Sequence, residues 1–284
     1  MNRTVTASGL ARLEWGDPAR PADLVFVHAN GFNAQTYRAL LEPLGAQWRI
    51  LAPDLRGHGF TDLPTAPENR ANWNDMRGDL AALLNALEGP PVVLAGHSMG
   101  GTLAMLAAAQ APHRVRAVMM LDPVILPRSA AAAMRIPGGW KLARRHPWAV
   151  AALKRRRRFP SLEAAFQSYQ GRGSFGAWPE AVLRDYVAGG FRRTADGGVE
   201  LACAPEWESS NYSAQGNDAW GALKRLDRPV HILKAGQGST CAVTLEDAAR
   251  LPSLTVETLD GGTHFFPMVQ ADLARAALRR ALEI

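Results

Sequence analysis

The feature that most constrains the fold is a series of short apolar runs spaced along the chain. The runs have four to seven residues and are rich in Val, Leu, Ile and Ala. Runs of this length and composition are typical of strands that are buried on both faces of a parallel sheet. They cover residues 24–27, 49–52, 91–95, 115–121 and 229–233, with 254–259 as a sixth candidate.

Helical patterns lie between these runs, and the first segment, Thr4 to Trp15, reads as one or two further strands. The predicted helices cover residues 36–44, 73–87, 101–111, 245–251 and 272–282. Because strands and helices alternate, we expect an α/β fold with a doubly wound, mostly parallel sheet and helices on both faces.

Residues 127–218 break this alternation. The segment has several helix-like pieces, many arginines and tryptophans, and no strong buried-strand run. We therefore predict a core made of residues 1–126 and 219–284, interrupted by an insertion at 127–218.

One short motif points to chemistry. Gly96-His97-Ser98-Met99-Gly100 follows an apolar run and precedes an alanine-rich helical pattern. A serine between two such glycines, at a sharp strand-to-helix turn, is held clear of the sheet with its hydroxyl exposed to reactants. The sequence therefore predicts Ser98 as a nucleophile.

Four segments together resemble the α/β-hydrolase superfamily, and they occur in that family's order. They are His28-Ala29-Asn30-Gly31-Phe32, Asp54-Leu55-Arg56-Gly57-His58-Gly59, the Ser98 motif and Gly261-Gly262-Thr263-His264-Phe265. The resemblance implies a serine hydrolase of the esterase kind, with residues 127–218 as a helical cap over the active site.

The resemblance also assigns roles to single residues. It implies His264 as the general base, in a loop after the last core strand. It implies that the backbone N–H of Met99 and that of Asn30 form the oxyanion hole, with Phe32 as the alternative to Asn30. His28 and His97 are expected to be structural neighbours of the site.

The acid that orients the base is harder to place. Most relatives carry it after the strand that corresponds to 229–233, but residues 234–240 contain no carboxylate and Ser239 stands near the expected position. A minority carry it one core strand earlier, which selects Asp122, directly after 115–121. The rival carboxylates are Glu246, Asp247 and Asp260.

The predicted reaction is hydrolysis of a carboxylic ester, or a related acyl bond, through an acyl-enzyme. Lactone hydrolysis and acyl transfer would use the same residues. A ligand-binding receptor or regulator on the same fold, with slow turnover, is the alternative from another class. The natural substrate, the physiological role and the oligomeric state stay open.

Charge and cysteine content bear on partners and compartment. The net charge of +6 is spread along the chain except for the run Lys154–Arg158, which we interpret as a solvated helix face, so no nucleic acid partner is expected. Cys203 and Cys241 lack metal-ligand spacing, and no cofactor or metal is predicted.

The chain has no evident signal peptide or membrane span, which favours a cytoplasmic protein.

Overall fold

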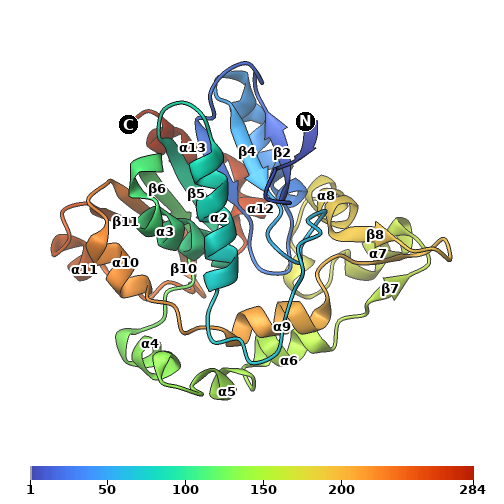
Figure 1. The fold of residues 1–284 in the computed structure, drawn as a ribbon. Coiled ribbons are helices and arrows are strands. Elements are labelled where there is room, and N and C mark those ends of the chain that lie inside the picture. The colour runs from blue at the N-terminus through green and yellow to red at the C-terminus, as the bar shows by residue number, and fades with distance from the viewer. Residues whose placement is uncertain (1) are drawn as a thin grey trace.

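The computed structural model describes residues 2–284 and contains one large sheet with helices on both faces (Figure 1). The eight strands of this sheet lie in the order β1-β2-β4-β3-β5-β6-β10-β11. Strands β4, β3, β5, β6, β10 and β11 are parallel to one another, and β1 and β2 add an antiparallel edge. The prediction of a doubly wound, mostly parallel sheet is therefore confirmed.

Six strands of the large sheet coincide closely with the apolar runs, and β1 and β2 correspond to the first segment. The eight strands are β1 (Asn2–Val5), β2 (Ala11–Trp15), β3 (Leu24–Val27), β4 (Ile50–Pro53), β5 (Val92–His97), β6 (Val115–Leu121), β10 (Val230–Gln237) and β11 (Leu254–Thr263).

The helices of the core cover the two faces of this sheet. They are α1 (Arg38–Leu41), α2 (Asn74–Ala86), α3 (Met99–Gln110), α10 (Ala219–Arg225), α11 (Leu245–Ala249), α12 (Phe266–Val269) and α13 (Ala271–Leu282). Helices α2, α3 and α10 close one apolar core, and α1 and α13 close the other. Short 3-10 turns flank α1, and the second of them contains Pro43 and Gly45, which end the helix predicted over 36–44.

Two core strands are longer than predicted. Strand β11 runs to Thr263, so residues 260–263 belong to this strand and do not form the loop that the sequence suggested. The cause is tertiary: β10 continues to Gln237, which pairs with Thr263 after a register shift. A glycine-rich sequence gives little indication of a strand by itself, and here pairing with β10 stabilises the extended backbone.

Residues 127–218, here called the insert, form a separate layer beside the sheet (Figure 1). Its elements are α4 (Arg128–Arg135), α5 (Trp140–Ala143), α6 (Pro147–Leu153), β7 (Arg158–Phe159), α7 (Leu162–Tyr169), α8 (Glu180–Gly190), β8 (Phe191–Arg193), β9 (Val199–Leu201) and α9 (Pro205–Ser213). Strands β7, β9 and β8 pair in a small antiparallel sheet that the sequence did not predict. These strands have only two or three residues each, too few for a visible pattern.

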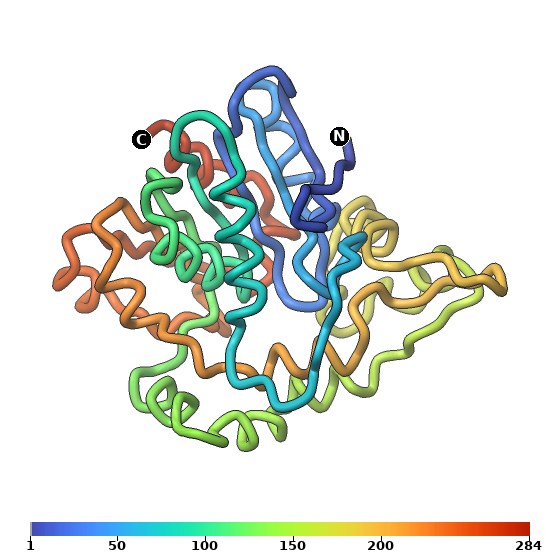
Figure 2. The backbone as a smooth tube through the Cα atoms, in the orientation of Figure 1, coloured from blue at the N-terminus to red at the C-terminus, as the bar shows by residue number. Residues whose placement is uncertain are grey.

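The path of the chain ties the insert to the core (Figure 2). The connection between β4 and α2 runs past α9, where Arg70 donates to Ser210 and Trp73 Nε1 donates to the Asn211 carbonyl at 3.0 Å. Both termini lie at the end of the molecule away from α5 and α6 (Figure 2).

Within residues 2–284, no helix has the length and apolar character that crossing a bilayer requires.

Candidate active site

Ser98 lies at the sharp turn between β5 and α3. Its backbone has φ 56° and ψ −124°, a left-handed conformation that non-glycine residues rarely adopt and that costs about 1–3 kcal/mol. The flanking glycines make this turn possible by allowing close contact between backbone segments. A Cβ on Gly96 would lie 2.5 Å from the Gly100 carbonyl oxygen, and a Cβ on Gly100 would lie 2.2 Å from the Val27 oxygen.

We expect Gly100→Ala to lower the free energy of unfolding by roughly 1–3 kcal/mol, because the new methyl group forces α3 away from β3. Gly78→Ala is the matched control, since Gly78 lies inside α2 with no atom within 4 Å of its added Cβ. That variant should be stabilised by about 0.5–1 kcal/mol. Urea unfolding followed by circular dichroism measures both, and equal effects would contradict the packing argument.

The structure brings Ser98, His264 and Asp122 together in one hydrogen-bonded line. The Ser98 hydroxyl lies 3.0 Å from His264 Nε2, and His264 Nδ1 lies 2.6 Å from Asp122 Oδ2. Ser98 and Asp122 are buried, and the His264 side chain is 17% exposed. With the proton on Nδ1, the imidazole donates to the carboxylate and its Nε2 can accept the serine proton.

Asp122 is held by donors from the segment that follows β10. Its Oδ1 accepts from the Ala235 N–H at 2.9 Å and the Ser239 hydroxyl at 2.5 Å, and its Oδ2 accepts from the Thr240 N–H at 3.2 Å. Burial alone would raise its pKa, but the hydrogen bond and charge of His264, with those other donors, lower the pKa to about 2. Ser239, which stands near the position where most relatives were expected to carry the acid, thus donates to Asp122.

The rival carboxylates lie elsewhere. Asp247 caps the first turn of α11 and pairs with Arg128, while Glu246 pairs with Arg250. Asp260 is exposed on β11. Among the described residues, Asp122 is the carboxylate that contacts the His264 ring.

The two predicted oxyanion donors lie at the start of α3 and in the loop after β3. Met99 is the first residue of α3, where backbone N–H groups have no partner within the helix. The Asn30 side chain is occupied, because Nδ2 donates to the Glu208 carbonyl at 3.0 Å and Oδ1 accepts from Asn211 at 2.9 Å. The Phe32 N–H already donates to the Ala29 carbonyl at 3.2 Å, which favours the backbone of Asn30 as the second donor.

A buried network that the sequence did not reveal connects this loop to His264. The Ala29 N–H donates to Tyr37 Oη at 3.1 Å, and the Tyr37 hydroxyl donates to His97 Nδ1 at 2.8 Å. His97 Nε2–H then donates to the His264 carbonyl at 2.8 Å. Burial, and after it the charge of His264, lowers the pKa of His97 to about 3, so this imidazole stays neutral. Nothing in the local sequence marks Tyr37, which lies in a 3-10 turn.

His28 and His58 brace the same loop, as expected for His28. His28 Nε2 accepts from the Leu55 N–H at 2.8 Å, and its Nδ1–H donates to the Ala29 carbonyl at 2.7 Å. His58 Nε2 accepts from the Gly31 N–H at 3.1 Å. Burial lowers the pKa of His28 to about 4 and that of His58 well below its ordinary value. Both rings are therefore neutral and hold this loop through hydrogen bonds.

The run Lys154–Arg158 does not form the predicted helix face, although its residues other than Arg155 are exposed. Helix α6 ends at Leu153, and the arginine that follows Lys154 turns inward. Arg155 forms a buried ion pair with Glu208 and donates to the hydroxyl groups of Tyr169 and Tyr186. A guanidinium on a flexible stem reaches such partners only when tertiary packing offers them.

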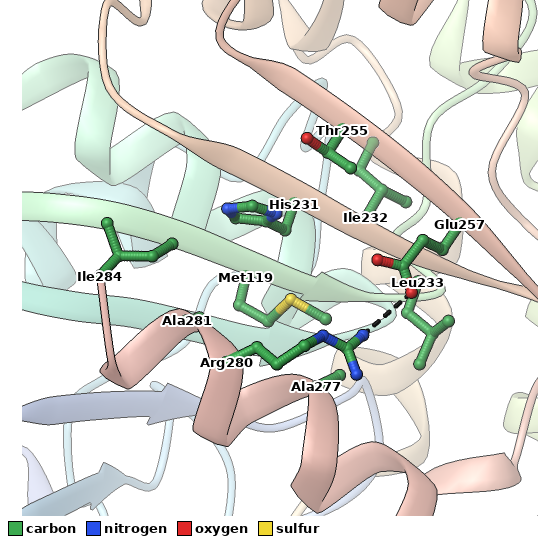
Figure 3. A pocket seen from close by; sticks show the side chains of 10 residues that line it. All are labelled: Met119, His231, Ile232, Leu233, Thr255, Glu257, Ala277, Arg280, Ala281 and Ile284. Atoms are coloured by element: carbon green, nitrogen blue, oxygen red, sulfur yellow. Dashed lines mark hydrogen bonds and ion pairs between the residues drawn. The ribbon is translucent and has the colours of Figure 1, made fainter.

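One cavity has a lining that does not include Ser98, His264 or Asp122 (Figure 3). It has a volume of about 270 Å³ between the first halves of β10 and β11 and helix α13. Its lining includes His231, Met119 and Ile284, and the Glu257–Arg280 ion pair spans 2.9 Å at its side (Figure 3). Ser98 and Asp122 instead follow the carboxyl ends of β5 and β6, where parallel sheets carry their sites.

The described part of the chain contains no cluster of potential metal-ligating side chains. No three His, Cys, Asp or Glu side chains of residues 2–284 are placed to hold an ion together. The polar groups at Ser98 are those of acid–base and nucleophilic chemistry.

Comparison with known proteins gives consistent matches over nearly the whole chain. Residues 24–277 match the model of the alpha/beta hydrolase family. The chain is 29% identical to the magnesium-chelatase 30 kDa subunit of Rhodobacter capsulatus, covering 91% of this chain and 87% of the relative. It is 28% identical to an esterase of Mycobacterium tuberculosis, covering 87% and 76%. The crystal structure of E-2-(acetamidomethylene)succinate hydrolase superposes with a TM-score of 0.80 at 23% identity, covering 100% and 99%.

Proposed function

This chain belongs to the alpha/beta hydrolase family, and from that premise we propose that it cleaves a carboxylic ester with Ser98 as nucleophile. The observation that carries the proposal is the hydrogen-bonded line from Ser98 through His264 to Asp122. A relative named as an esterase supports the same chemistry.

In the proposed reaction, the Ser98 hydroxyl attacks the acyl carbon while His264 Nε2 takes its proton. Asp122 stabilises the imidazolium that forms, and the N–H groups of Met99 and Asn30 hold the oxyanion. His264 then gives the proton to the leaving alcohol. Water, deprotonated by the same imidazole, hydrolyses the acyl-enzyme and restores the Ser98 hydroxyl.

Aromatic side chains beside His264 would contact the substrate. Phe265 lies 5.3 Å from the His264 ring, and Phe32 lies 6.3 Å from Phe265, measured between ring centroids. Trp178 from the insert lies 5.4 Å from Phe32. These rings favour an apolar group near the acyl carbon, and they support residues 127–218 as a cap on a core of 1–126 and 219–284.

A second candidate, a binding or regulatory protein with slow turnover, is favoured by one comparison. The relative from Rhodobacter capsulatus is named as a subunit of magnesium chelatase and not after a hydrolytic reaction. A complete triad does not distinguish the two, because a receptor can retain the geometry of the site.

Turnover on a panel of activated esters of graded acyl length separates these candidates. We expect many product equivalents per enzyme, with kcat/KM varying by more than about tenfold across acyl lengths, because one methylene in an apolar pocket changes binding by a measurable amount. A lactone, a thioester and an added alcohol acceptor in the same panel test the related reactions. Release of a single equivalent on every substrate would favour the binding role.

A further inference from the structure

The outer surface of the insert carries large apolar side chains that nothing in the described chain covers. Within residues 136–156, the exposed fractions are Ile136 63%, Leu142 70%, Trp148 49%, Val150 37% and Leu153 53%. Most of the large apolar side chains exposed over the described residues thus come from this short stretch. Such clustering marks an interaction surface, whereas single exposed apolar residues are ordinary.

Four of these side chains lie on α5 and α6, namely Leu142 on α5 and Trp148, Val150 and Leu153 on α6. Both helices lie against α9, at the end of the molecule opposite the termini (Figure 1). Helix α6 buries Ala149 and Ala152 and leaves Trp148, Val150 and Leu153 exposed. At about 100° per residue, Trp148 and Leu153 lie on the two flanks of the buried alanine side and Val150 lies toward the open side, so α6 exposes large apolar side chains that a surface helix usually buries.

The same stretch is strongly basic. Residues 123–162 contain no Asp or Glu. Some of its arginines are neutralised by carboxylates from other elements, such as Arg157 by Glu206 and Arg158 by Glu200. The exposed cations for which the described chain provides no carboxylate are Lys141, Arg144, Arg145, Lys154 and Arg156.

We propose that this basic-apolar patch, made of those five cations and the five apolar side chains, docks on the surface of an anionic lipid bilayer. Trp and Leu side chains enter the boundary between headgroups and acyl chains, while Lys and Arg contact the anionic headgroups. Nucleic acid would match the charge, but binding to phosphates does not require exposed Leu, Ile and Val. The apolar half of the patch therefore selects lipid.

Co-sedimentation of the purified full-length protein with phospholipid vesicles tests the proposal. We expect binding to vesicles of phosphatidylcholine mixed with phosphatidylglycerol, weaker binding to phosphatidylcholine alone, and a decrease with added salt. The triple variant Lys141→Gln, Arg144→Gln, Arg145→Gln should weaken binding about tenfold or more. The control variant changes Arg172, Arg193 and Arg279, which are exposed outside the patch, and should bind like the wild type.

A matched leucine pair tests the apolar half. Leu142 and Leu245 are both 70% exposed, and only Leu142 lies in the patch. Leu142→Ser should weaken vesicle binding roughly threefold to tenfold, and Leu245→Ser should leave it unchanged. Circular dichroism verifies that the variants are folded. Absence of binding to anionic vesicles would overturn the proposal, and so would equal losses of vesicle binding in the two leucine variants. Binding to duplex DNA that is tighter than binding to vesicles, and that Leu142→Ser does not affect, would also overturn it.

Discussion

Ester turnover by the Ser98→Ala variant is expected to fall by about a millionfold, with no covalent product left to detect. Removal of a triad serine has this magnitude because both acylation and deacylation proceed through its oxygen. The Ser98 hydroxyl oxygen lies 3.0 Å from His264 Nε2, so without it the imidazole has no serine proton to accept. Initial rates on the best ester of the panel measure the loss.

A fluorophosphonate probe gives a second readout that does not depend on finding a good substrate. Wild-type protein should be labelled on Ser98, and the alanine variant should not be labelled. Ser253→Ala is the matched control, because Ser253 donates to the Leu226 carbonyl far from the site. Labelling or turnover that survived in Ser98→Ala, with the control behaving as wild type, would refute Ser98 as the nucleophile.

Asp122→Asn is expected to lower kcat by roughly ten-thousandfold while KM changes little. The amide cannot stabilise an imidazolium, and it can donate to Nδ1, which places the imidazole proton on Nε2 and removes the acceptor for Ser98. The control is Asp247→Asn, since Asp247 lies in the rival segment and pairs with Arg128. Near-normal turnover in Asp122→Asn, or a large loss in Asp247→Asn, would contradict the assignment.

The low pKa of Asp122 adds a test by pH. Because His264 and the donors of the Ser239 segment hold this pKa at about 2, the carboxylate stays charged at every pH above about 4. A loss of rate between neutral pH and pH 5 must therefore come from another group. If Asp122 titrated in that range instead, infrared spectra would show its protonated carboxyl band appearing, and the band would be absent in Asp122→Asn.

The parts of this protein that could be predicted from the sequence are those with local causes. Buried strands require continuous apolar runs, so β3, β5 and β6 were recognisable as strands. The turn at Ser98 requires small neighbours, because a Cβ on Gly96 would lie 2.5 Å from Gly100 within the same motif. These constraints act within a few residues, and a motif can record them.

Which carboxylate meets the His264 ring was decided by the tertiary structure. Asp122 and His264 are 142 positions apart in the sequence, and they meet because β6 lies beside β10, which in turn pairs with β11. The sequence could offer Asp122 only as one of several carboxylates, since strand order is not written in local composition.

Tertiary packing also decided which polar side chains turn inward. The hydroxyl of Tyr37 meets His97 across the apolar core, and Arg155 leaves its basic run to pair with Glu208. Burying such groups costs free energy unless partners from other elements satisfy them. A sequence shows which groups can donate and accept, but only the assembled fold brings each donor to its acceptor.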